Sequence, residues 1–142
     1  MKKIMILCAV ILGFTITAKA QTDPKPEFKF NEEKHDFGKI PQGKPVTVNF
    51  EFTNIGEEPL ILTEVKPTCG CTIADYTKTP VLKNAKGVIK ITYNAMALAP
   101  FNKTIIVTSN AKTPTKYLVI MGEVIAPAGT AAATTGTTGT QK

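Results

Sequence analysis

Apolar and polar residues alternate with a period of two along much of this chain. The segment VTVNFEF at 46–52 shows it most clearly, with apolar Val46, Val48, Phe50 and Phe52 against polar Thr47, Asn49 and Glu51. This alternation is typical of a strand that buries one face. No apolar pattern with the helical period of 3.6 persists for the length that a helix requires. The dominant local structure is therefore predicted to be β.

Further strands are predicted at 27–37, 59–65, 87–93, 103–109 and 116–125. In 87–93, Ile89, Ile91 and Tyr93 are expected to share one face. Between these segments lie turn formers such as PQGKP, NIGEEP, PTCG, KNAKG and NAKTPT. Six or seven short strands in about 100 residues predict an all-β fold, an immunoglobulin-like antiparallel β-sandwich of about seven strands, with a small barrel as the competing architecture.

The N-terminus has the three parts of a secretory signal peptide. MKK is basic, IMILCAVILGFTIT is apolar, and AKA places small residues before a cleavage point. Residues 1–20 are therefore expected to be removed, taking Cys8 with them, so that the mature protein begins at Gln21 and is exported to the periplasm or secreted. An uncleaved anchor is the alternative, but the apolar run is shorter than the ~20 residues that span a bilayer comfortably. No membrane span is expected after cleavage.

The rest of the chain divides into one domain and two flanking segments. Residues 21–26, QTDPKP, contain no core-forming side chain, and 127–142 form a low-complexity Ala/Thr/Gly tail. Both are predicted to be flexible. The folded domain is predicted at 27–126, which is enough for one core and too short for two.

The charge pattern bears on the class of partner. Removing Lys2, Lys3 and Lys19 lowers the formal net charge by three, from +6 to +3, and the chain has no arginine. The other lysines are scattered among acidic residues, whereas a nucleic-acid-binding protein typically gathers Lys and Arg on one face. No nucleic-acid partner is predicted. A protein or envelope partner is expected, and the sequence leaves its identity and the oligomeric state open.

Three stretches together resemble a known family. They are HDFGKIPQGKPVTVNFEFTNIGEEPLILTEVKPTCGCT, GVIKITYNA and NKTIIVTSNA. The chain is similar over 30–124 to the bacterial domain-of-unknown-function family 1573, a relative of the Hydin-like immunoglobulin-fold domains. Its most specific element is CGCT after an F-x-N-x-G-x-x-P-L segment; family members often have serine where this chain has Thr68, which keeps the hydroxyl. The resemblance implies an exported Ig-like domain and no settled activity.

Several residues near the turns have predicted structural roles. Phe37 is expected to anchor the core, and Gly38 to adopt a backbone conformation closed to other residues. Asn54 and Gly56 are suited to positive φ in a hairpin connection. His35 is the only histidine. Its position favours a surface or hydrogen-bonded role, with metal binding or catalysis as the alternative.

Conventional enzyme chemistry has little support in the sequence. Ser109 is the only serine, and no G-x-S-x-G motif surrounds it. Glycine-rich phosphate loops and carboxylate-rich metal loops are also missing from the sequence. The protein is therefore predicted not to be an enzyme, with thiol–disulfide exchange as the one open case.

That case rests on Cys69 and Cys71, which flank Gly70. A bridge that closes about three residues should stabilise the fold by only ~1.6 kcal/mol, against ~3 kcal/mol for about fifteen. Such a short bridge is cramped, and strained disulfides are more easily reduced. Gly70 is expected to let the backbone bring the sulfurs together. Pro67, Thr68, Gly70 and Thr72 are predicted to form the supporting turn.

Three interpretations of the cysteine pair remain. It is a structural turn, a thiol-exchange site, or a contact for a soft metal such as Cu(I), with His35 or Met96 as further ligands. Structural zinc is less favoured because it usually takes four ligands. The sequence favours a non-catalytic binding or structural module of the bacterial periplasm or envelope without a cofactor. The alternative is a thiol-redox or copper-handling factor that uses Cys69, Gly70 and Cys71.

Overall fold

The computed structural model describes residues 24–127. The predicted signal peptide and nearly all of the predicted Ala/Thr/Gly tail lie outside the described residues. The chain ahead of residue 27 is partly packed, because Pro26 is buried and the carbonyl groups of Pro24 and Pro26 accept hydrogen bonds from the Glu58 and Lys112 N–H groups. The described fold therefore begins slightly before the boundary predicted at residue 27.

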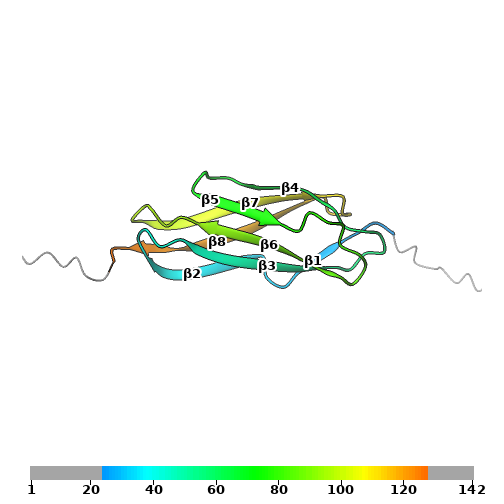
Figure 1. The fold of residues 1–142 in the computed structure, drawn as a ribbon, viewed down its shortest axis with the longest axis horizontal. Helices are drawn as coiled ribbons and strands as arrows, with labels where there is room; N and C mark the ends of the chain where they lie inside the picture. Colours follow the sequence, from blue (N-terminus) through cyan, green and yellow to red (C-terminus); the bar gives the residue numbers. More distant parts are fainter. Residues whose placement is uncertain (1–23, 128–142) are drawn as a thin grey trace, which may run out of the picture.

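Eight strands form two four-stranded sheets packed as a sandwich (Figure 1). One sheet has the order β1-β3-β6-β5 and the other the order β2-β8-β7-β4. The strands are β1 (Phe28–Phe30), β2 (Lys34–Pro41), β3 (Val46–Asn54), β4 (Leu62–Pro67), β5 (Thr72–Tyr76), β6 (Lys86–Tyr93), β7 (Pro100–Ser109) and β8 (Thr115–Ile125). The predicted Ig-like β-sandwich is confirmed. Its strands pair antiparallel, except that β2 and β8 pair parallel.

Two predictions about the strands need correction. The strand expected at 27–37 is two strands, β1 and β2, which lie in different sheets. The polar stretch from Asn31 to Glu33 joins them. In addition, β5 was not predicted, because its alternation runs opposite to the usual one: Thr72 is buried, whereas Ile73 is exposed.

The predicted apolar faces of β3 and β6 form the centre of the core. Phe50, Phe52, Ile89 and Ile91 are buried almost completely. Around them, Phe28, Phe30 and Phe52 pack ring against ring, and Tyr93 stacks on Phe101 with ring centroids 4.1 Å apart. Phe37 packs against the edge of this cluster as predicted. The two sheets are therefore held together by apolar packing, with no disulfide joining them among residues 24–127.

The prediction of positive φ at Asn54 and Gly56 is wrong. The residues with positive φ in the described chain are Gly38, Gly43, Asn84 and Ala95, so the prediction for Gly38 is confirmed. Asn54 is instead fully buried and donates through Nδ2 to the carbonyls of Glu58 (2.8 Å) and Val81 (2.9 Å).

Gly56 is needed for space rather than for its φ. A Cβ there would lie 2.5 Å from the Lys25 carbonyl oxygen and 2.5 Å from the Pro26 Cα, where backbone crosses backbone. Asn54 and Gly56 therefore fasten the β3–β4 connection to neighbouring segments.

Candidate functional site

The CGC turn, residues 68–72, connects β4 in one sheet to β5 in the other. Within it the Sγ atoms of Cys69 and Cys71 are bonded to each other, with their Cα atoms 5.3 Å apart. Both cysteines are half-exposed, and Cys71 also packs against the edge of the core. In this oxidised form the pair presents no free thiolate. Metal contact of the kind considered from the sequence would require the reduced form.

Hydrogen bonds fasten both sides of the CGC turn. The N–H and the hydroxyl of Thr68 both donate to the carbonyl of Thr104 on β7, each at 3.0 Å. On the other side, the Asn94 N–H donates to the Cys71 carbonyl at 3.1 Å, and the Thr72 N–H donates to the Cys69 carbonyl at 3.2 Å. The disulfide is therefore presented on a firmly anchored turn.

The predicted supporting residues differ in what they contribute. Pro67 is the last residue of β4 and pairs with Ile105, and Thr72 is a buried polar residue. A Cβ on Gly70 would meet nothing within 4 Å, and its φ lies outside the left-handed range. The turn therefore has room for a side chain at position 70. Neither the space around this position nor its φ requires glycine, contrary to the expectation from the sequence.

The immediate surroundings of the sulfurs are polar on one side. The Cys71 N–H donates to Cys69 Sγ at 3.2 Å, and the Thr72 hydroxyl lies 3.9 Å from Cys71 Sγ. A donor aimed at sulfur stabilises negative charge on it. The contact at Cys69 is the shorter of the two, so Cys69 is the sulfur better placed to carry a thiolate.

His35 is not brought to the cysteine pair. It lies on β2, where its Nδ1 is 3.2 Å from Glu32 Oε1. Its ring packs edge-on against the Phe37 ring, with the ring centroids 4.7 Å apart. β2 and β4 are opposite edges of one sheet, with β8 and β7 between them, so they lie roughly 14 Å apart at the usual strand spacing. Within residues 24–127, no three His, Cys, Asp or Glu residues gather as a metal site would require.

Met96, the other candidate ligand, lies near the turn. Its N–H donates at 3.3 Å to the Oδ1 of Asn94, whose own N–H holds the Cys71 carbonyl. The Met96 side chain is 62% exposed. The loop at 94–99 therefore lies beside the CGC turn and adds apolar surface at this end of the sandwich.

A second feature of this region is the free edge of β5, which begins at the residue after Cys71. Among the strands of residues 24–127, β5 is last in its sheet and pairs only with β6. Ile73 is 70% exposed, more than any other large apolar side chain in the described chain. Sequence reasoning missed this edge; the reversed alternation of TIADY after the cysteines was the available signal.

The other three edges are each interrupted. β1 has only 3 residues, β2 has a register shift between Asp36 and Lys39, and β4 has one between Leu62 and Glu64. Short strands and bulges are devices that block the addition of another strand. β5 instead keeps a continuous register with β6 over its whole length. It is the most regular open edge of the described sandwich.

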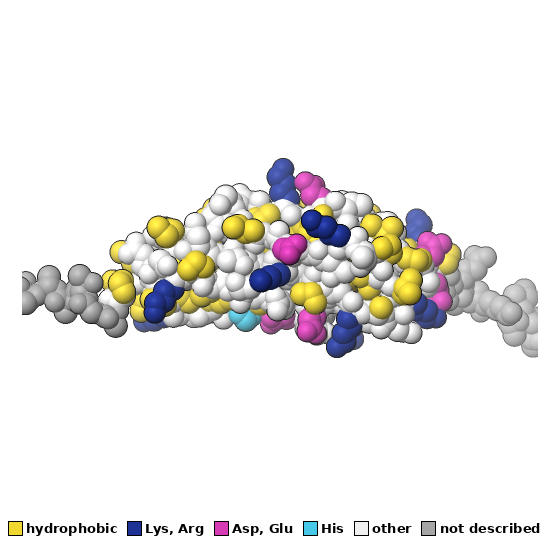
Figure 2. All heavy atoms as spheres, in the orientation of Figure 1, with side chains coloured by type: hydrophobic (Ala, Val, Ile, Leu, Met, Phe, Trp, Pro, Cys, Tyr) yellow, Lys and Arg dark blue, Asp and Glu magenta, His cyan; other side chains and the backbone are white. Residues whose placement is uncertain are grey.

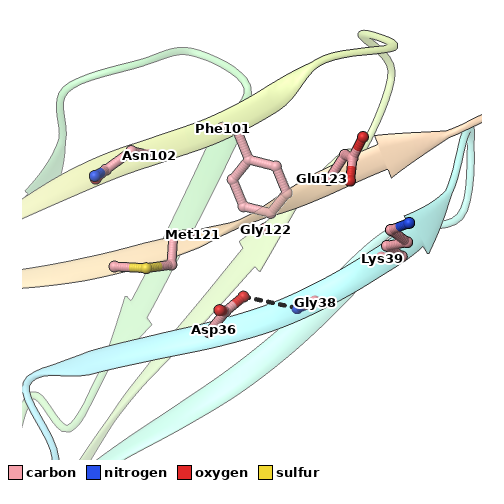
Figure 3. A pocket seen from close by; sticks show the side chains of 8 residues that line it. All are labelled: Asp36, Gly38, Lys39, Phe101, Asn102, Met121, Gly122 and Glu123. Atoms are coloured by element: carbon pink, nitrogen blue, oxygen red, sulfur yellow. Dashed lines mark hydrogen bonds between the residues drawn. The ribbon is translucent and has the colours of Figure 1, made fainter.

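A shallow hollow of about 380 Å³ lies between β2, β8 and β7, beside the bulge in β2 (Figure 3). Its floor is the Phe101 ring and Gly122, where a Cβ would lie 2.8 Å from the Gly38 carbonyl oxygen. Asp36 Oδ1 accepts the Gly38 N–H at 2.8 Å. Asp36, Lys39, Asn102 and Glu123 stand around the floor (Figure 3). The hollow thus lies beside the bulge, and its rim carries both charges.

Charged side chains are dispersed over the face of the molecule that Figure 2 shows. Figure 2 shows Lys side chains and acidic side chains interspersed on the visible face, with apolar groups between them. No helix in residues 24–127 is long and apolar enough to cross a membrane. The face seen in Figure 2 thus has the mixed charge that the scattered lysines of the sequence predict.

Comparisons with known proteins identify a matching family and structures with a similar fold. A family model described as "Protein of unknown function (DUF1573)" matches residues 28–124. No curated protein matches the sequence.

Three solved structures illustrate the similarity. A Porphyromonas gingivalis W83 protein of unknown function is 16% identical, with a TM-score of 0.65 and coverage of 76% of this chain and 51% of that one. PapD-like domain 7 of human CEP192 is 11% identical, with a TM-score of 0.59 and coverage of 82% and 96%. The YadV chaperone is 13% identical, with a TM-score of 0.51 and coverage of 72% and 54%. The chain spans about half the length of the first of these structures. At these identities the similarity shows the fold alone.

Proposed function

This chain belongs to the DUF1573 family of proteins of unknown function, and we propose that it is an exported, non-catalytic Ig-like binding module of the bacterial periplasm or envelope. The observation that carries the proposal is the continuous edge of β5, with which no other strand of the described chain pairs. The proposed occupant is an extended segment of a partner protein, which adds to the sheet as a further strand. Strand addition of this kind is a common mode of peptide recognition.

The hydrogen-bond pattern fixes which backbone groups of β5 point outward. The Thr77 N–H donates to the Val88 carbonyl and the Asn94 N–H donates to the Cys71 carbonyl, so residues 71, 73, 75 and 77 face β6. Because the bonds of an antiparallel ladder alternate, residues 72, 74 and 76 face away from it.

Ala74 is the centre of this outward-facing edge. The N–H groups of its two outward-facing neighbours are already engaged, that of Thr72 by the Cys69 carbonyl and that of Tyr76 by Asp75 Oδ1 at 2.9 Å. The Ala74 N–H and carbonyl together form the complete donor and acceptor pair that an incoming strand requires. One residue of the partner can therefore exchange two hydrogen bonds with Ala74.

The side chains suit an extended segment with mixed character. Ile73 presents an exposed apolar side chain on the outer face of the sheet, and Asp75 and Lys90 lie opposite each other on β5 and β6. A partner strand would place an apolar residue beside Ile73 and a polar residue beside Asp75. Similarity to a chaperone and to PapD-like domains supports a fold that is suited to protein contacts.

Export rests on the signal-peptide pattern of residues 1–20. It would bring the module to a compartment where the Cys69–Cys71 disulfide persists. No cofactor is proposed for this module.

Site-specific photo-crosslinking in the producing cell tests the binding proposal. A photoreactive residue at Ile73 should give a discrete cross-linked product. The same residue at Tyr117, which is 58% exposed on β8 of the other sheet, is the matched control and should not. Equal products from both positions, or none from Ile73, would refute binding at the β5 edge.

A further inference from the structure

We propose further, resting on the proposed function, that the Cys69–Cys71 disulfide is a thiol acceptor that covalently captures a cysteine of the segment bound along β5. Cys71 directly precedes Thr72, the first residue of β5. A strand that adds to this edge therefore passes beside the disulfide. The bound segment and the reactive bond thus share one continuous site.

Three observations make the bond a suitable acceptor. Both cysteines are half-exposed, so a thiol can approach. The bridge spans two residues in sequence, so it closes one of the smallest rings that a disulfide can form, and its entropic stabilisation of the fold is small. The turn is anchored by Thr68 and Asn94 rather than by the disulfide alone. Opening the bond should therefore leave the fold in place.

The geometry also assigns the two sulfurs. The Cys71 N–H, 3.2 Å from Cys69 Sγ, stabilises a thiolate on Cys69, which makes Cys69 the better leaving group. The incoming thiolate is therefore expected to attack Cys71 Sγ. This is also the sulfur adjacent to β5 in the chain.

The exchange is balanced without any other oxidant. The partner's thiol gives its proton to solvent, and its thiolate forms a bond to Cys71 Sγ. The Cys69–Cys71 bond breaks, and its electron pair leaves on Cys69 as a thiolate. If the partner holds a second thiol, that thiolate attacks the partner's own sulfur and releases Cys71. The partner is then oxidised by two electrons to a disulfide, and this protein is reduced by two electrons to the dithiol.

The register predicts where the partner's cysteine lies. In an antiparallel addition, the residue two positions after the one opposite Ala74 lies opposite Thr72, and the next lies opposite Cys71. The reactive cysteine should therefore stand three residues after the residue that pairs with Ala74. Met96, exposed on the neighbouring loop, offers an apolar contact beyond that cysteine.

The test uses the oxidised mature protein and two defined thiols. One is an eight-residue peptide of alternating valine and threonine with one cysteine near its C-terminus, and the other is N-acetylcysteine. N-ethylmaleimide traps the released thiol, and intact mass with peptide mapping locates each group. The peptide should bond to Cys71 with maleimide on Cys69, about tenfold faster than N-acetylcysteine, as two backbone hydrogen bonds would give.

Two controls separate binding along β5 from simple reactivity. Ala74→Pro removes an N–H that faces away from β6, so the sheet should persist. An N-methyl group on the peptide residue opposite Ala74 blocks the reciprocal bond without changing the protein. Each should lower the peptide rate to that of N-acetylcysteine and leave the N-acetylcysteine rate unchanged. The methylated peptide decides the matter if the proline variant does not fold.

The outcomes distinguish this inference from the proposed function. No adduct with either thiol, equal rates for both, or an adduct on Cys69 would each overturn the capture step. Cross-linking from Ile73 that persists in such a case would leave the binding module standing. If the peptide is captured rapidly and neither Ala74→Pro nor N-methylation lowers its rate, then binding along β5 does not direct the capture, and that part of the inference is overturned.

Discussion

Asn54 provides the sharpest test of how the β3–β4 connection is held. Its side chain uses both amide hydrogens, toward the carbonyls of Glu58 and Val81, and its Oδ1 accepts the Gly56 N–H at 3.0 Å and the Glu27 N–H at 3.4 Å. The residue is fully buried. Asn54→Ala removes all of these bonds at once.

The expected loss follows from which partners water can reach. The bonds to Val81 and Gly56 are buried, whereas those to Glu58 and Glu27 are only partly so. Leaving a buried donor or acceptor unsatisfied costs about 1–3 kcal/mol. The Gly56 N–H is left as such a group, at about 2 kcal/mol, whereas the Val81 carbonyl keeps the Leu60 N–H at 2.9 Å and loses one net hydrogen bond worth about 1 kcal/mol. Together they predict a fall of about 3 kcal/mol in the free energy of unfolding for Asn54→Ala.

Urea unfolding of the mature chain measures this loss. At a slope of about 1.5 kcal/mol/M, a loss of about 3 kcal/mol shifts the midpoint by about 2 M. Asn49→Ala is the matched control, because Asn49 is exposed on the same strand, and its effect should stay within about 0.5 kcal/mol. A loss below about 1 kcal/mol for Asn54→Ala would refute the reasoning that these bonds fasten the connection.

Three further predictions concern two glycines, the disulfide and the N-terminus. Gly56→Ala should destabilise the fold by about 1–3 kcal/mol in the same urea assay, because its Cβ would meet the backbone of residues 25–27. Gly70→Ala should be nearly neutral, because its Cβ would meet open space, and equal losses for the two variants would contradict this difference. The double variant Cys69→Ser, Cys71→Ser should lose at most about 1.6 kcal/mol and keep its cooperative transition, and a larger loss would make the bridge a structural staple. Intact mass of the protein recovered from its native compartment should place the first residue at Gln21, and a retained N-terminus would contradict cleavage after residue 20.

Sequence reasoning reached the architecture because one-sided burial leaves a direct trace. β3 and β6 each bury every second side chain, so the period of two in the sequence indicates which residues face the core. The alternation places Phe50 and Ile91 on the core face, and both are fully buried. The pattern does not report which strands pair, so the parallel contact of β2 with β8 could not be read from it.

Other features escaped because they depend on contacts between distant segments. Asn54 looks like a turn residue in isolation, and only the folded chain brings the Val81 carbonyl to its amide. Gly56 is required by the crossing of Lys25 and Pro26, which lie about 30 residues earlier in the chain. The F-x-N-x-G-x-x-P-L segment thus records packing and fastening of the fold rather than chemistry.

The sequence revealed the cysteine pair of the candidate site but not its surroundings. Cys69 and Cys71 are conspicuous in sequence, and their bond is local. The surroundings of the pair come from distant parts of the chain, because Thr104 and Asn94 anchor the turn from two other segments. The open edge of β5 likewise depends on the order of the strands in the sheet, which the local sequence does not give. Since β1, β2 and β4 are shortened or bulged while β5 is regular, the edge beside the disulfide is where strand addition meets the least obstruction. The function of the cysteine pair is therefore best sought in what binds beside it, rather than in its contribution to stability.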